Sequence, residues 1–168
     1  MGAKNFTMNT KEQVAEWDKV LDEYESSVGL GKYSDTNSFS ETELNGYFNM
    51  TRDQIEKQTP EACAEIALRL GQYAFFIQRT VNRETARHNW ADETIKETIA
   101  DEINNYKGYG YAEKSLQAIK HNEKALALNK IKKYAKQRMD RLSYLANNIK
   151  NLSDILLLIN KNKVKHGS

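Results

Sequence analysis

A repeat of apolar residues between Leu128 and Ile159 is the feature that most constrains the fold of this chain. The spacings alternate between three and four, which is the period of a packed helical seam, and Arg138 alone interrupts them. The apolar positions are Leu128, Ile131, Ala135, Leu142, Leu145, Ile149, Leu152, Leu156 and Ile159. A repeat of more than four heptads predicts a long helix with a coiled-coil seam that also serves self-association.

The rest of the composition agrees with an all-α fold. One proline and 8 glycines in 168 residues are too few to form the turns of a many-stranded sandwich or barrel.

The mean hydropathy of −0.77 and the short length of the longest apolar run, Ile155 to Ile159, argue against a membrane protein. The N-terminal residues lack the apolar core of an export signal, and Cys63 has no second cysteine to pair with. We therefore expect a cytoplasmic protein with no membrane partner.

A second long helix is predicted upstream of the seam. Thr59 and Pro60 are a favourable helix start, because the hydroxyl can cap the helix and proline needs no backbone donor there. Apolar residues then recur at helical spacing up to Ile103, and residues 80–94 are polar on most faces, which predicts a kink or a register-setting polar layer. With a turn at about 104–110 and a helix from about 111 to 160, residues 59–168 form a long antiparallel hairpin with a stutter near 121–124.

The first 58 residues are predicted to be a separate appendage. Thr10 and Gln13 have the spacing of a capping box before an amphipathic helix at about 11–28. A linker rich in Ser, Thr, Asn and Asp follows, and Ser40 and Glu43 are spaced to cap a short apolar helix. The division is therefore 1–58 and 59–168.

Self-association is expected from the surplus of apolar surface. Two helices of a single hairpin cannot bury all of it against each other, and large aromatic side chains lie off the main stripes. These aromatic residues are Phe75, Phe76, Trp90 and Tyr144. We therefore expect a homo-oligomer.

Residues with the patterns of an active site are few. The three histidines form no HExxH pair and no repeated ExxH pair, and no glycine-rich phosphate loop occurs. Glu84, His88 and Asp92 share one helix face and are potential metal ligands, but a solvated or register-setting polar face is the favoured interpretation. Cys63 is expected to be a buried structural thiol. The prediction is a protein that is not an enzyme and has no metal and no cofactor.

Charge is distributed unevenly along the chain. Residues 1–60 have a net charge of −5, whereas residues 105–168 carry 14 Lys and Arg against 4 Asp and Glu, a net of +10. A basic C-terminal part favours a polyanionic partner, and we expect single-stranded nucleic acid, with DNA favoured. A solvated coiled-coil exterior is the alternative explanation for these lysines.

The turn between the long helices favours unpaired bases as the ligand. Tyrosines alternate there with a lysine and two glycines, so flat rings for stacking lie beside a cation. The alternative is that these tyrosines cap the hydrophobic seam. The candidate nucleic-acid-binding residues are Tyr106, Lys107, Tyr109, Tyr111, Lys114, Lys120, Lys124, Lys130, Lys132, Lys133, Lys136, Arg138 and Arg141.

This layout resembles the phage UvsY-type recombination mediators over about residues 62–160. The matching parts are the turn Tyr106-Lys107-Gly108-Tyr109-Gly110 and the second helix, basic from Lys120 to Arg141 and apolar up to Ile159. The resemblance implies a non-enzymatic, oligomeric accessory protein of phage-type homologous recombination. Such a protein binds single-stranded DNA and helps to load a recombinase onto strands covered by a single-strand binding protein, in the host cytoplasm if it is phage-encoded.

Residues 1–58 have no counterpart in that family, and the polar stretch near Asn82 to Asp92 departs from a simple packed helix. The acidic first segment is a candidate to mask the basic helix or to dock a partner. A coiled-coil structural or adaptor protein of a virion or other assembly, with no nucleic acid binding, is the alternative function.

Overall fold

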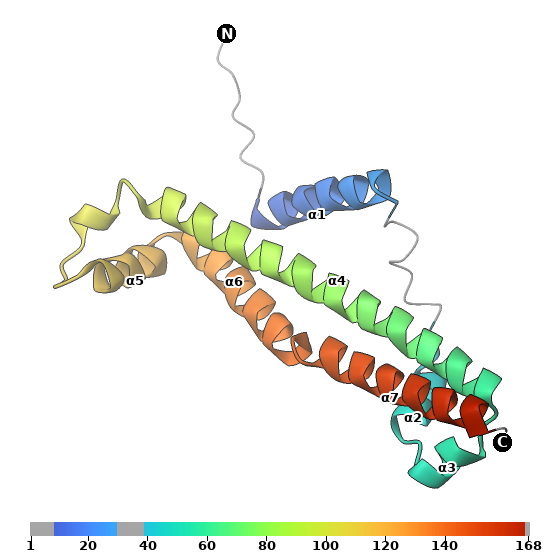
Figure 1. The fold of residues 1–168 in the computed structure, drawn as a ribbon. Helices are drawn as coiled ribbons and strands as arrows, with labels where there is room; N and C mark the ends of the chain where they lie inside the picture. The colour runs from blue at the N-terminus through green and yellow to red at the C-terminus, as the bar shows by residue number, and fades with distance from the viewer. Residues whose placement is uncertain (1–8, 30–38, 167–168) are drawn as a thin grey trace. The chain divides into compact units, whose positions relative to one another are not determined.

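The computed structural model describes residues 9–29 and 39–166, and every regular element among them is helical (Figure 1). The all-α prediction is confirmed. The helices are α1 (Thr10–Ser27), α2 (Glu41–Phe48), α3 (Arg52–Lys57), α4 (Pro60–Ile99), α5 (Tyr111–His121), α6 (Glu123–Leu142) and α7 (Leu145–His166), with a 3-10 turn, η3, at Ile103–Asn105. No helix in the described ranges has the length and apolar character needed to cross a bilayer. Most of the predicted linker, residues 30–38, lies outside the described residues.

Contacts divide the chain into two units that both take part of α4. The first unit comprises residues 1–34 and 84–137, and the second comprises residues 35–83 and 138–168. Coiled-coil pairing and a boundary at residue 58 stay predictions.

The second unit is built on the first part of α4 and on α7. Leu70 and Leu156 are almost completely buried between them, and the Ser153 hydroxyl donates a 2.8 Å hydrogen bond to the Ala67 carbonyl oxygen. Six of the predicted seam residues pack in or against this core: Leu142, Leu145, Ile149, Leu152, Leu156 and Ile159. Here the predicted seam forms an intramolecular core.

The first unit has its own core, where the last turns of α4 meet α5 and α6. Ile95, Ile99 and Leu128 are buried in it together with Ile103 of η3. Of the other predicted seam residues, Ala135 is buried and Ile131 is half-buried. The 3.6-residue period of the sequence therefore reports intramolecular packing in both units.

Helix α4 begins where the sequence predicts. The Thr59 hydroxyl accepts a hydrogen bond from the Ala62 backbone N–H at 3.2 Å, and the helix continues unbroken for 40 residues. It ends at Ile99 rather than Ile103, because the chain passes through turns into η3. Cys63 is fully buried, as expected of a structural thiol.

The single second helix predicted for residues 111–160 is wrong, since that segment consists of three helices. The break at Asn122 lies within the predicted stutter, and the Asn122 side chain caps α6 by accepting from the Ala125 backbone N–H at 3.0 Å. A second break falls at Ser143 and Tyr144, where the Ser143 hydroxyl bonds to the Asp140 carbonyl oxygen. Such local side-chain bonds compete with helix continuation, and the apolar spacing gives no sign of them.

The first amphipathic helix is confirmed as α1, with a different cap. Asn9 and Glu12, rather than Thr10 and Gln13, form the capping box, because the Asn9 side chain accepts from the Glu12 backbone N–H at 3.0 Å and the Glu12 carboxylate accepts from the Asn9 backbone N–H at 2.8 Å. Gly29, with φ of +80°, follows its last turn in the left-handed conformation that glycine adopts at helix ends. Ser40 caps α2 as predicted, whereas α3 was not foreseen.

Two of the aromatic side chains that were expected to need partners contact other rings within the chain. Trp90 stacks on Trp17 of α1 with ring centroids 6.0 Å apart, and Phe76 stacks on Tyr73 at 6.2 Å. Phe75 and Tyr144 are exposed. Part of the apolar surface that led us to predict oligomerisation is therefore covered by other residues of the same chain.

Candidate nucleic-acid interface

The turn that precedes α5 is fixed by side chains of α5 itself. Glu113 accepts a hydrogen bond from the Tyr109 backbone N–H at 3.0 Å, and the Gln117 amide donates to the Lys107 carbonyl oxygen at 3.0 Å. A Cβ at Gly108 would lie 3.1 Å from the Cβ of Glu113, so a larger residue there would require the turn or α5 to shift by a few tenths of an ångström. The backbone of the turn is thus held in place while its outer side chains face solvent.

Two of the three tyrosines of the turn are presented to solvent. Tyr109 is fully exposed, and Tyr111 at the start of α5 is 63% exposed. Tyr106, by contrast, is half-buried against the core of the first unit, with its ring 5.5 Å from that of His121. The turn therefore combines both interpretations left open by the sequence, because Tyr106 packs on the apolar core and Tyr109 and Tyr111 offer free rings.

Most of the predicted lysines in the first unit are exposed along the turn, α5 and α6. Lys114 is half-buried. The exposed ones are Lys107, Lys120, Lys124, Lys130, Lys133 and Lys136. Exposed ammonium groups on neighbouring helical turns suit contacts with successive phosphates, which need charge and reach but no fixed geometry.

Lys132 is bound to α4. Its ammonium donates to Asp92, and Lys96 lies on the other carboxylate oxygen of Asp92 at 2.6 Å. The hydrogen bonds from Lys132 and then Lys96 lower the pKa of Asp92 below its usual range, and Asp92 raises the pKa of Lys96. Asp92 shares its single negative charge between Lys132 and Lys96, so the Lys132 charge is partly compensated and a phosphate would have to compete with Asp92 for it.

Arg138 and Arg141 are exposed but belong to the second unit. The surface formed by the turn and the lysines of the first unit therefore does not include these two arginines.

An ion pair joins the polar stretch of α4 to α1. Arg87 donates to Glu84 and to Asp18 of α1, each at 2.7 Å. Burial opposes the charge of Arg87, but the hydrogen bond to Asp18 and the charge of Glu84 outweigh it and raise the pKa of Arg87. Glu84 is itself nearly buried, as a polar layer requires. Within the described ranges, no three His, Cys, Asp or Glu side chains lie close enough together to hold a metal ion.

The sequence did not reveal the residues that position this interface through contacts within the chain. Glu113 and Gln117 secure the turn, and Asp92 withdraws Lys132 from the exposed lysines. The Asp92–Lys132 pair joins residues 40 positions apart, so no local spacing could reveal it.

Comparison with protein-family models, with curated proteins and with solved structures finds no match. The UvsY-type resemblance therefore stays a hypothesis based on the turn and the basic helix.

Proposed function

We propose that the protein binds single-stranded nucleic acid, with DNA favoured, through its turn and the adjacent lysines. The exposure of Tyr109 and Tyr111 beside Lys107, on a backbone anchored by α5, is the observation that carries the proposal. Large aromatic rings in full contact with water cost free energy that burial would recover. Stacking with unpaired bases covers such rings, and it requires no particular base sequence.

The exposed lysines of α5 and α6 supply the second part of the binding energy. Each ammonium that neutralises a phosphate releases condensed counterions, so affinity falls as salt rises. The finer role, that of a non-enzymatic mediator that assists recombinase loading in the cytoplasm, rests on the UvsY-type resemblance alone. In that role the protein would act as a homo-oligomer and contact a recombinase or a single-strand binding protein.

Replacing Lys124, Lys130 and Lys133 together by alanine is expected to weaken binding and to flatten its salt dependence. All three side chains are exposed, so helicity should not change. Loss of three phosphate contacts should reduce the slope of log K against log salt by about 2, since each contact to a single strand contributes about 0.7. Fluorescence anisotropy with a labelled oligonucleotide at several salt concentrations measures this slope.

The matched control replaces Lys150, Lys161 and Lys165 of α7 by alanine. These lysines are also exposed, but they lie in the second unit, so this variant has the same net charge and leaves the proposed surface intact. Equal loss of slope in both triple variants would mean that net charge, and not this surface, governs binding.

A coiled-coil structural or adaptor protein is the second candidate, and an exposed stripe on the second unit favours it. The residues of this stripe are spaced by three and four along α7 and the turn before it, and none of them is charged. They include Ile155 and Leu158, whose side chains are 52% and 60% exposed. Its residues are Tyr144, Asn148, Asn151, Ile155, Leu158 and Asn162. Side-chain amides both donate and accept hydrogen bonds, so these asparagines can pair with the same residues of a parallel second copy.

Leu158→Lys is expected to dissociate such an assembly to single chains of 19.4 kDa in light scattering after size exclusion. The control is Leu157→Lys, because Leu157 is also exposed on α7 but lies off the stripe. A wild-type protein that is already monomeric, or an equal effect of both variants, would rule out the stripe as the contact.

A further inference from the structure

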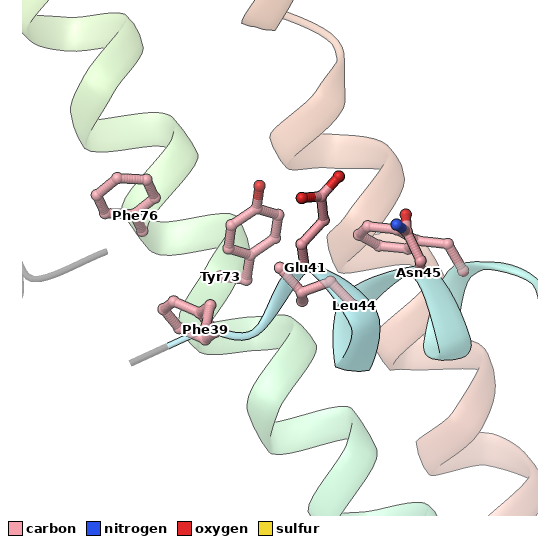
Figure 2. Close-up of a pocket in the computed structure, with 7 residues that line it drawn as sticks. Phe39, Glu41, Leu44, Asn45, Tyr73 and Phe76 are labelled. Carbon is pink, nitrogen blue, oxygen red and sulfur yellow. The ribbon is translucent and has the colours of Figure 1, made fainter. Parts of the chain in front are cut away.

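A second feature, unrelated to the turn, is an aromatic pocket in the second unit. It has a volume of about 250 Å³ and lies between α2, the residues just before it and α4 (Figure 2). Four rings line it, from Phe39, Phe48, Tyr73 and Phe76, and Glu41 and Asn45 supply its polar groups. Its volume is below the roughly 300–1,000 Å³ of pockets for drug-sized ligands, so a single small group fits it best.

The three phenylalanine rings of the pocket each contact the ring of Tyr73. Phe39 is tilted against Tyr73 by 58° with centroids 5.2 Å apart, and Phe48 is tilted by 46° at 6.3 Å. Phe76 lies nearly parallel to Tyr73, with an interplanar angle of 18° and centroids 6.2 Å apart. Because each ring face carries partial negative charge, a small pocket lined by four aromatic rings favours a cation.

One cation already lies on this aromatic cluster. The Arg69 guanidinium is 4.9 Å from the centroid of the Phe39 ring. Its charge is compensated by Glu43, whose oxygens lie 3.3 and 3.4 Å from Arg69 nitrogens, and these bonds lower the pKa of Glu43. Arg69 therefore shows that Phe39 accepts a cation, while its pairing with Glu43 limits the repulsion of a second one.

Glu41 supplies a counter-charge for such a second cation. Its side chain is exposed at the pocket, and in Figure 2 the Glu41 carboxylate and the Tyr73 hydroxyl point the same way. Among the described residues, no cation forms an ion pair with Glu41. A carboxylate beside a group of ring faces matches a positively charged group with an apolar exterior.

We propose that this pocket binds an organic ammonium group, held by the faces of Tyr73 and its neighbouring rings with Glu41 as counter-ion. Neither the size of the pocket nor its charge suits a nucleotide, so the site is independent of the nucleic-acid interface. A small quaternary ammonium ion and the end of a lysine side chain share the required chemistry.

The test compares choline with its uncharged isostere 3,3-dimethylbutan-1-ol, each titrated into the full-length protein and followed by aromatic NMR shifts. Both probes have the same shape, so their difference isolates the charge. Choline is expected to shift the resonances of Tyr73 and to bind between about 3-fold and 30-fold more tightly than the alcohol. Equal binding of the two, or no shift with choline, would overturn the proposal.

Glu41→Gln is the variant that tests the counter-ion. It should weaken choline binding and leave binding of the alcohol unchanged, whereas Glu61→Gln, an exposed change on α4 outside the pocket lining, should leave both unchanged. Unaltered choline binding by Glu41→Gln would overturn the role of Glu41. A third probe, N-acetyl-lysine methylamide, distinguishes the two sources of the ammonium group. Tighter binding of this probe than of choline would indicate a lysine side chain of a protein, and weaker binding would indicate a small free ion.

Discussion

The double replacement Tyr109→Ala and Tyr111→Ala is expected to weaken binding of a single-stranded oligonucleotide at least about 30-fold. Stacking of one base on one aromatic ring contributes about 1–3 kcal/mol, and the variant removes both exposed rings of the turn. The salt dependence should change little, because no lysine is removed. Anisotropy titrations at one fixed salt concentration measure the affinity, and circular dichroism should show unchanged helicity.

Tyr24→Ala is the control for this double variant. Tyr24 is 64% exposed, close to the 63% of Tyr111, but it lies on α1 and belongs neither to the turn nor to the exposed stripe of α7. Its removal should leave affinity unchanged. If the double variant binds as tightly as the natural chain, the turn does not stack on bases, and the lysines alone would account for any binding.

Leu70→Ala is expected to lower the free energy of unfolding by about 2–5 kcal/mol. Leu70 has no exposed surface, and it packs in the same core as Leu156 of α7. The variant loses the transfer free energy of the buried side chain and leaves a cavity that the helices cannot fill without distortion. Urea unfolding followed by circular dichroism measures the change.

The control lies two residues earlier on the same helix. Leu68 is 61% exposed, so Leu68→Ala should change stability by no more than about 0.5 kcal/mol. Because both variants make the same chemical change in α4, the difference between them reports burial alone. A similar loss in both would contradict the assignment of the α4 face that packs on α7.

Local signals in the sequence predicted much of the fold. The Thr59-Pro60 start of α4 and the Ser40 cap of α2 are short-range features, and the structure confirms both. The apolar repeat correctly marked the buried side of α6 and α7, since every seam position is buried or half-buried. A periodic pattern reports which side of a helix packs, but it does not report whether the partner is the same chain or another copy.

The remaining features depend on contacts that have no local pattern. The break at Ser143 leaves the apolar spacing intact, and α3 is only six residues long. At the candidate interface, the sequence could not distinguish the half-buried Tyr106 from the exposed Tyr109. It also could not distinguish Lys132, which is paired with Asp92, from the exposed Lys133. Burial and ion pairing depend on residues that are distant in the sequence.

The most direct test of the proposed function is anisotropy of a fluorescent single-stranded oligonucleotide at several salt concentrations, with duplex DNA as competitor. The stacking rings and exposed lysines predict binding that weakens steeply with salt and resists competition by duplex, because paired bases cannot stack on Tyr109 and Tyr111. Absence of binding even at low salt, or equal competition by duplex, would contradict the proposed single-strand interface.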